Sequence, residues 1–262
     1  LMSFWISFNS WDGIAPTMQF VGLKNYVDQI ADADFRKSLL NTVIYSLMFI
    51  PLDLILALML AIAVQKIKGK SFYRLFYFMP VVTGSVSVGV IWTWIMNGDF
   101  GLLNTILGAV GITGPKWLTD PKIVLFSIVI VSVWWNVGYN MVLLLAGLQN
   151  IPEVYYEAAE IDGANKWKAF RHITLPMLSP TLFFVLIMTI ISSFQVFDQA
   201  YVMTQGGPMK ASYTLVYHIY QGAFVEFRMG GACAASVILF AIILAITMIQ
   251  MYGSKRWVNY EQ

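Results

Sequence analysis

The chain has 262 residues, of which 58% are hydrophobic and 11% are charged. Soluble domains carry about 25% charged residues, so this composition excludes an ordinary soluble protein and predicts a protein embedded in a lipid bilayer. One Cys excludes a disulfide framework and Cys-rich zinc sites, and a net charge of +2 without a basic, aromatic cluster excludes nucleic-acid binding.

The opening stretch, residues 1–8, is apolar but shorter than the roughly 20 residues that a membrane helix needs. It lacks the basic start and the cleavage site of a signal peptide. We interpret it as the end of a first span whose beginning is missing from this sequence. An outer loop is expected over 9–37.

Five long apolar runs follow, and we expect spans at 38–65, 75–97, 123–148, 177–204 and 229–252. The membrane interior offers no water to backbone groups, and runs this long without strand alternation favour helices. With the opening stretch, the sequence predicts one all-α bundle of about six transmembrane helices over 1–262. Glycines break up the outer loop 99–120, which leaves room only for short helices.

Lys and Arg residues set the orientation, because cytoplasmic loops carry an excess of them. One set of loops holds nine of them, including a tight cluster, and is predicted to be cytoplasmic, which also places the C-terminus inside the cell. These nine are Lys66, Lys68, Lys70, Arg74, Lys166, Lys168, Arg171, Lys255 and Arg256. The other seven are Lys24, Arg36, Lys37, Lys116, Lys122, Lys210 and Arg228.

The cytoplasmic segment 149–176 is far longer than the roughly 2–8 residues that connect bundle helices. Pro152 is typical of a helix start, and Asp162-Gly163 is a turn signal. We expect a second short helix over 165–172, with Pro176 beginning the next span. The segment is either a solvated loop or a docking surface, and its Trp167 favours docking.

The same segment resembles the EAA motif of ABC importer permeases through Glu157-Ala158-Ala159, Asp162-Gly163-Ala164 and Pro176. Further stretches resemble signatures of the carbohydrate-uptake branch, the family of the maltose and glycerol-3-phosphate permeases. In chain order they are Phe20-Val21-Gly22-Leu23-Lys24-Asn25-Tyr26, Tyr73-Arg74 with Met79-Pro80, Trp117-Leu118-Thr119-Asp120-Pro121, and Thr204-Gln205-Gly206-Gly207-Pro208. The resemblance covers nearly the whole chain.

The resemblance implies a mechanism and a set of partners. The EAA helices would act as coupling helices on a cytoplasmic ATPase dimer, with Glu157 offering a carboxylate, Ala158 and Ala159 allowing close seating, and Gly163 setting the bend. A second homologous permease and an extracytoplasmic solute-binding protein would complete a sugar importer in a bacterial or archaeal cytoplasmic membrane.

ATP and Mg would bind on the partner subunits and not on this chain, for which we predict no catalytic centre. Gly69-Lys70-Ser71 resembles the end of a P-loop, but Val64 stands where the motif requires the first Gly, and a membrane helix precedes it.

Polar residues inside spans are candidates for a substrate path, because their burial in lipid is costly. Those on the third and fourth full spans are Ser132, Trp135, Asn136, Tyr139, Asn140, Ser192, Ser193 and Gln195. The resemblance places a sugar site on these spans and adds Val196 as a lining position. Alternatively, the same residues are hydrogen-bonding contacts between helices.

Asp53 lies in the middle of the first full span, where it is either an ion relay or a structural hydrogen-bond acceptor; we prefer the second reading. The relay reading would make the chain an ion-coupled secondary transporter, the main alternative, and a membrane scaffold is a third. Asp198 is expected to brace the outer-loop turn at Gly206, Gly207 and Pro208. The two isolated His residues predict no metal site.

Overall fold

The computed structural model describes residues 2–65, 67, 69–255 and 257–258. Lys66, Lys68 and Arg256, which we assign to cytoplasmic loops, lie outside these residues, as does Leu1 of the expected first span. The predicted helical membrane fold is confirmed: helices dominate, and the only strands in the described residues form one two-stranded ladder.

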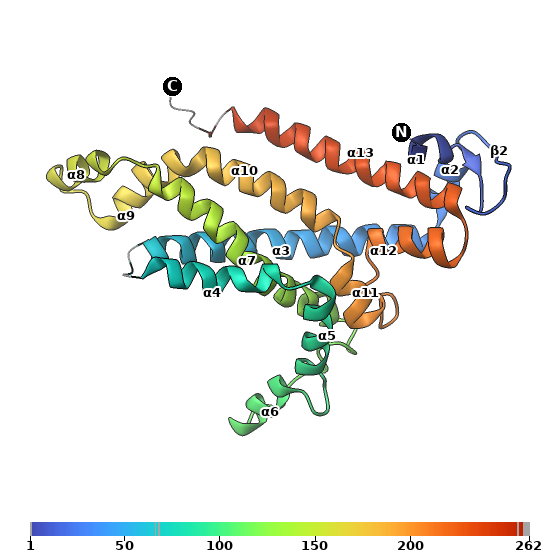
Figure 1. Ribbon diagram of the computed structural model, residues 1–262, viewed down its shortest axis with the longest axis horizontal. Helices are drawn as coiled ribbons and strands as arrows, with labels where there is room; N and C mark the ends of the chain where they lie inside the picture. The colour runs from blue at the N-terminus through green and yellow to red at the C-terminus, as the bar shows by residue number, and fades with distance from the viewer. Residues whose placement is uncertain (1, 66, 68, 256, 259–262) are drawn as a thin grey trace. The chain divides into compact units, whose positions relative to one another are not determined.

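The chain divides into two compact units. Unit 1 contains residues 1–49, 84–132 and 191–245, and unit 2 contains residues 50–83, 133–190 and 246–262. Four long helices contribute residues to both units: α3 (Ala33–Gln65), α7 (Val124–Gln149), α10 (Leu175–Phe194) and α13 (Met229–Ser254). All four are labelled in Figure 1.

Unit 1 begins with α1 (Met2–Ile6), and its strands β1 (Asn9–Ser10) and β2 (Gln19–Phe20) pair antiparallel, with Asn9 opposite Phe20. The Asn25 amide at the start of α2 (Lys24–Ala31) donates to the carbonyls of Ser7 and Asn9, 2.8 and 2.9 Å away. The shorter helices of this unit are α5 (Ser85–Ile95), α6 (Leu102–Ala109), α11 (Asp198–Thr204), α12 (Leu215–Tyr220) and the π-helix η2 (Gln221–Val225).

Unit 2 contains α4 (Lys70–Val82), α8 (Glu153–Ile161), α9 (Lys166–Ala169) and the π-helix η1 (Phe170–Thr174). Two glycines of α7 permit close helix contacts. Gly138 lies against the backbone of Tyr77 on α4, and Gly147 lies against Leu178 and Thr181 on α10. Small residues at such points let helices approach without any apolar driving force from lipid.

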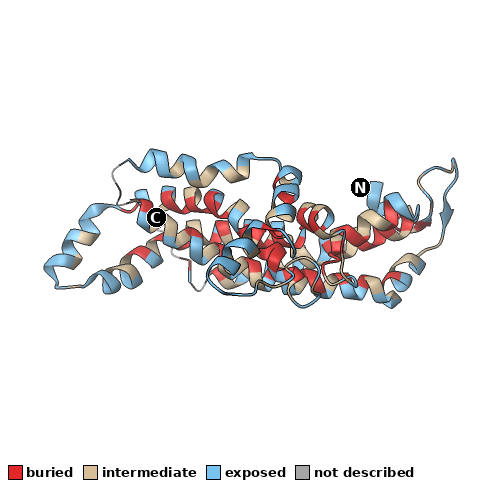
Figure 2. Cartoon of the chain, turned by 90° about the horizontal axis from the view of Figure 1, so that it is seen from below, coloured by how far each residue is buried: buried red, intermediate tan, exposed pale blue. Residues whose placement is uncertain are grey.

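Among the residues that the structure describes, four helices are long and apolar enough to cross a membrane: Ala33–Gln65, Val124–Gln149, Lys166–Phe194 and Met229–Ser254. The number rises to five if the pair α4 and α5 is one bent span, so the expected count of six stays a prediction. These helices expose large apolar side chains, such as Leu47, Phe240 and Ile249, which are 65–71% exposed. Figure 2 shows the exposed faces along the helices, as expected for surfaces that meet lipid.

Three expected spans differ from the observed helices. The run 75–97 is interrupted between Val82 and Ser85, where Thr83 has an extended conformation and Gly84 lies outside both α4 and α5. The run 177–204 ends its first helix at Phe194 and forms α11 separately. The third difference concerns the expected span 38–65. The helix α3 begins at Ala33, five residues earlier than expected, and ends at Gln65.

Candidate functional site

The segment that resembles the EAA motif forms two short helices, α8 and α9, joined by a turn at Gly163 (Figure 1). The Ala164 N–H donates to the Ala159 carbonyl at 2.9 Å, and the Gly163 N–H donates to the Glu160 carbonyl at 3.1 Å. This pair of bonds is a Schellman motif, which requires a left-handed residue after the helix. Gly163 supplies it with φ of 74°, a conformation that glycine adopts without strain.

The second short helix is capped but not separate from the next span. The Asn165 side chain accepts a 2.8 Å hydrogen bond from the Lys168 N–H, which satisfies an end group of α9. The helix then continues through η1 into α10, so the expectation that Pro176 begins the span is wrong. Pro176 is tolerated because it lies in a π-to-α junction, where regular i to i−4 bonding is already interrupted.

Exposed apolar side chains project from this segment. Val154 is 69% exposed, Ile161 is 87% exposed and Trp167 is 65% exposed, and α8 has no buried residue. Glu157 and Ala158 are also exposed, whereas Ala159 is partly covered. In Figure 2 the segment at the far left is mostly pale, and thus exposed. Single exposed apolar residues are ordinary, but a group of them marks an interaction surface.

A cavity of about 670 Å³ lies at the base of the same segment, within unit 2. Its lining includes Asn150, Tyr155, His172, Pro176 and Thr181, which come from the end of α7, from α8, from η1 and from α10. Beside it, the Tyr156 hydroxyl and the Thr174 hydroxyl are hydrogen-bonded at 2.9 Å. This bond ties α8 directly to the start of the following long helix.

The substrate-path candidates of unit 2 lie on α7 and include one buried network. The Asn140 side-chain N–H₂ donates to Asp53 Oδ2 at 2.5 Å and to Thr189 Oγ1 at 3.0 Å. Asn136 donates to the same Asp53 oxygen at 3.4 Å. Asp53 is therefore a hydrogen-bond acceptor for a neighbouring helix, as we preferred from the sequence, and the network joins α3 to α7 and, through Asn140, to α10.

The other two candidates on this part of α7 are less enclosed. Trp135 is half-buried, and its indole N–H donates to the Thr83 carbonyl at 3.1 Å. Tyr139 is 38% exposed. Thr189, which completes the network, was missed by the sequence reasoning, although its place one turn before Ser192 and Ser193 was a usable signal.

The remaining candidates lie in unit 1 and differ in exposure. Ser132, Ser193 and Val196 are buried, whereas Ser192 and Gln195 are exposed. Gln195 and Val196 follow the end of α10, and the Val196 carbonyl accepts a hydrogen bond from Thr214 Oγ1 at 2.9 Å. The structure thus brings Asn136 and Asn140 together on Asp53, and it spreads the other candidates over two units.

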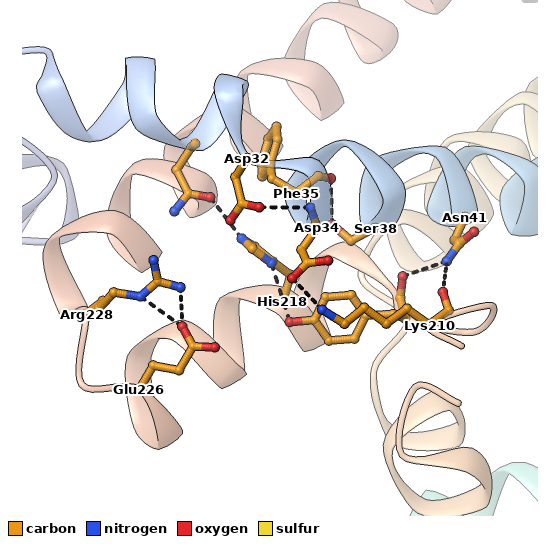
Figure 3. Close-up of polar contacts among 11 residues, drawn as sticks. Asp32, Asp34, Phe35, Ser38, Asn41, Lys210, His218, Glu226 and Arg228 are labelled. Carbon is orange, nitrogen blue, oxygen red and sulfur yellow. Dashed lines mark hydrogen bonds and ion pairs between the residues drawn. The ribbon is translucent and has the colours of Figure 1, made fainter. Parts of the chain in front are cut away.

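The loop that follows α11, which the sequence predicts to lie on the outer side, has an unusual backbone. Gly206 has φ of 75°, the Gly207–Pro208 peptide is cis, and Met209 and Lys210 have φ of 49° and 57°. The Asn41 amide holds this loop by donating to the carbonyls of Lys210 and Tyr213, at 2.8 and 3.0 Å (Figure 3). Asp198 does not brace it as expected, because its carboxylate accepts from the Ser85 hydroxyl on α5.

A buried histidine lies beside this loop in unit 1. His218 on α12 is 5% exposed and contacts Gln29 Oε1 through Nε2 at 2.9 Å. Figure 3 shows the neighbouring ion pairs, one between Asp34 and Lys210 and one between Glu226 and Arg228. Burial lowers the pKa of His218 below its usual value of 6.5, so that the neutral ring is favoured.

Residues 34–259 match the family model described as "Binding-protein-dependent transport system inner membrane component". The chain is 36% identical over 94% of its length to a probable ABC transporter permease protein, YurN, of Bacillus subtilis (strain 168), covering 86% of that protein. It is 36% identical over 95% of its length to the sn-glycerol-3-phosphate transport system permease protein UgpA of Agrobacterium fabrum, covering 85% of that protein.

Another similar protein is the trehalose/maltose transport system permease protein MalF of Thermococcus litoralis, with 35% identity over 95% of this chain and 84% of that protein. Among solved structures, a bacterial alginate ABC transporter in complex with an alginate pentasaccharide-bound periplasmic protein matches with a TM-score of 0.82. That match covers 90% of this chain and 83% of the other chain at 21% identity, so it supports the fold alone.

Proposed function

The chain belongs to the family of binding-protein-dependent transport system inner membrane components, and on that premise we propose that it is the permease subunit of an ABC importer for a sugar or sugar-like solute. Its path would be formed with a second, homologous permease. Alternating access in this pair would be driven by ATP hydrolysis in separate subunits.

The exposed helix–turn–helix of α8 and α9 carries the proposal. Its apolar side chains Val154, Ile161 and Trp167 are 65–87% exposed, which suits docking into a cleft of a cytoplasmic ATPase subunit. Glu157 is exposed beside them and would meet a basic group of the ATPase. The bond between Tyr156 and Thr174 and the unbroken helix from α9 into α10 support transmission of a movement from this segment to a membrane span.

The proposed cargo rests on the relatives and on the chemistry of the path. Relatives of this chain are named for transport of glycerol-3-phosphate and of trehalose and maltose. Within unit 2, Trp135 and Tyr139 offer ring faces, Tyr139 also offers a hydroxyl and Asn136 an amide, and none of these three is fully buried. Ring faces with amides and hydroxyls suit a solute that has apolar faces and hydroxyl rims, so we assign these residues to the path.

The proposed partners follow from the same assignment. An extracytoplasmic solute-binding protein would deliver the cargo on the side of the outer loop with Gly206, Gly207 and Pro208, and an ATPase dimer would bind ATP and Mg on the cytoplasmic side, where the C-terminus would also lie. The chain itself would hold no cofactor, because Gly69-Lys70-Ser71 lacks the first glycine and the strand that a P-loop needs.

Two substitutions in the segment test the coupling in a reconstituted complex. Gly163→Pro is incompatible with φ of 74°, and Glu157→Lys reverses the charge of an exposed side chain. Both should abolish ATP hydrolysis that is stimulated by the loaded binding protein. Gly163→Ala is the matched control, because no atom lies within 4 Å of its β-carbon and only the backbone strain remains. It should retain part of the stimulation, whereas normal coupling in both test variants would contradict the assignment.

The ion-coupled alternative is not favoured. It depended on Asp53 as an ion relay, but the Asp53 carboxylate accepts hydrogen bonds from the amides of Asn136 and Asn140. In addition, relatives of this chain are described as ABC transporter permeases. A carrier of that kind would also have no use for the exposed docking segment. Transport without ATP, driven by an imposed proton gradient, would be the result that revives it.

A further inference from the structure

We propose that Asp53 is a positioning residue, which fixes the orientation of the Asn136 amide and so presents an acceptor oxygen, and not a donor, to the cargo. This inference rests on the proposed function, because it assigns the polarity of one group in the proposed path. It uses four residues of unit 2 that lie on three helices: Asp53 on α3, Asn136 and Asn140 on α7, and Thr189 on α10.

The first step is the chemistry of the two kinds of side chain. A carboxylate is an acceptor only, whereas an amide has a donor end and an acceptor end. Asp53 is completely buried, so water cannot compete for its Oδ2 atom. The amide nitrogens of Asn136 and Asn140 therefore both face Asp53, and the reversed amide would set an oxygen against an oxygen.

The second step is the difference between the two amides. Asn140 is 2% exposed, and both hydrogens of its nitrogen are used, by Asp53 and by Thr189. Asn136, one turn earlier on the same face of α7, is only partly buried. Its Oδ1 accepts no hydrogen bond from any residue that the structure describes. Asn140 is thus a fixed internal contact, while Asn136 retains one oriented, accessible acceptor.

The third step is the cost of the arrangement. Asp53 Oδ1 is buried and has no hydrogen-bond partner within the described chain. A half-satisfied buried carboxylate destabilises a fold in comparison with a neutral amide of the same shape. Stability alone therefore gives no reason for Asp at position 53. The direction of the hydrogen bond gives a reason for Asp. An Asn at position 53 could rotate its amide by 180° and present its N–H₂ to Asn136, and the Asn136 amide could then rotate as well.

The consequence for the cargo is a preference for a hydroxyl or another donor at this point of the path. Neighbouring Trp135 and Tyr139 would contact a ring face, and the Asn136 oxygen would accept from a hydroxyl at its rim. A cargo group that can only accept, such as a carboxylate, would meet an acceptor there and would be rejected.

The test exchanges the two side chains in the complete complex of permeases, ATPases and binding protein. Asp53→Asn keeps an acceptor but loses the direction, and Asn136→Asp sets two carboxylates against each other. The double variant Asp53→Asn with Asn136→Asp restores one donor and one acceptor and again leaves an oxygen accessible at position 136. Thr189→Val is the matched control, because it removes a partner of Asn140 and leaves Asn136 and Asp53 in place.

The first measurement is thermal unfolding, in detergent, of the natural complex and of the complexes with each of these variants. This measurement needs no cargo. We expect Asn136→Asp to lower the unfolding temperature, Asp53→Asn to leave it unchanged or raise it, and the double variant to recover most of the loss. If Asn136→Asp is equally harmful with and without Asp53→Asn, the proposed orientation is wrong, whatever the cargo is.

The second measurement is ATP-driven uptake of radiolabelled maltose, trehalose and sn-glycerol-3-phosphate as probes. Asp53→Asn should raise the probe concentration at half-maximal uptake about tenfold, the effect of leaving one polar group of the cargo unpaired. The double variant should return to within about threefold of the natural chain, and Thr189→Val should not shift this concentration. An unchanged value in Asp53→Asn overturns the positioning role. Absence of uptake of all three probes by the natural complex would instead count against the proposed cargo class, and the unfolding measurement would still decide on the orientation.

Discussion

Gly138 on α7 lies against the backbone carbonyl of Tyr77 on α4, so closely that a β-carbon at position 138 would overlap the carbonyl oxygen. Gly138→Ala should therefore force α4 and α7 apart and destabilise unit 2 by about 1–3 kcal/mol, the usual cost of overpacking. Thermal unfolding of the assembled complex measures this. Gly253→Ala on α13 is the control, because no atom lies within 4 Å of its β-carbon and Ala favours a helix. Equal effects of the two substitutions would contradict the close contact.

Asn104 on α6 organises the loop between α5 and α7. Its amide nitrogen donates to the carbonyls of Gly98 and Pro115, and its oxygen accepts from the Trp117 indole at 2.8 Å. Asn104→Ala should destabilise this loop by about 1–2 kcal/mol, because three polar groups lose their partner. Limited proteolysis of the loop should become several-fold faster than in Thr113→Ala, which alters an exposed residue of the same loop. Equal cleavage of the two variants would show that the three bonds do not hold the loop.

Ile161, the last residue of α8, is 87% exposed, as is Met209 in the loop after α11. If α8 docks on the ATPase, Ile161→Asp should reduce the amount of ATPase that copurifies with the permease about tenfold or more, the loss typical of a contact at the centre of an interface. Met209→Asp changes an equally exposed apolar residue and should have no effect on this retention. The unfolding temperature of the permease should stay constant in both, since neither side chain is packed. Loss of ATPase in both variants would point to a general effect of added charge.

His218 should make the stability of unit 1 dependent on pH. Burial lowers its pKa below 6.5, so the unfolded chain binds a proton at a higher pH than the folded chain does. The free energy of unfolding therefore has its full value above about pH 7, and it decreases as the pH falls below about 6.5 towards the pKa of His218 in the folded state. Replacement by Gln, which does not titrate, should flatten the dependence of the unfolding temperature on pH in this range. An unaltered slope in His218→Gln would assign the dependence to other groups.

The sequence predicted those parts of the fold that the membrane environment dictates. Apolar runs without charge must form helices in lipid, and α7 and α13 begin and end within one or two residues of expectation. The turn at Gly163 was also predictable, since Asp-Gly signals a turn and a left-handed residue ends α8. The break between α4 and α5 was missed, because the run around it carries no charge and its mean hydropathy stays high, although Thr83-Gly84-Ser85 offered a local turn signal.

Partners distant in the sequence were the least predictable part of the candidate site. Asp53 and Asn140 are 87 positions apart, and Asp198 and Ser85 are 113 apart. The sequence singled out Asp53, Asn140 and Asp198 as polar residues in apolar runs, but not Ser85, and the pairing of all four depends on how the helices pack. The continuation of α9 into α10 was missed for a local reason: Pro176 usually marks a helix start, and the π-helical turn before it removes that requirement.

That continuation makes the segment from Lys166 to Ile190 one continuous helical segment within unit 2, with Pro176 and Pro180 inside it. At 1.5 Å per residue it is about 37 Å long, so a tilt of about 10° around one end displaces the other end by roughly 6 Å. A flexible hinge at Pro176 would have absorbed such a movement in the loop. Without such a hinge, a tilt that starts at the α9 end is carried along the helix, and the displacement at Ile190 grows with the length of helix between them.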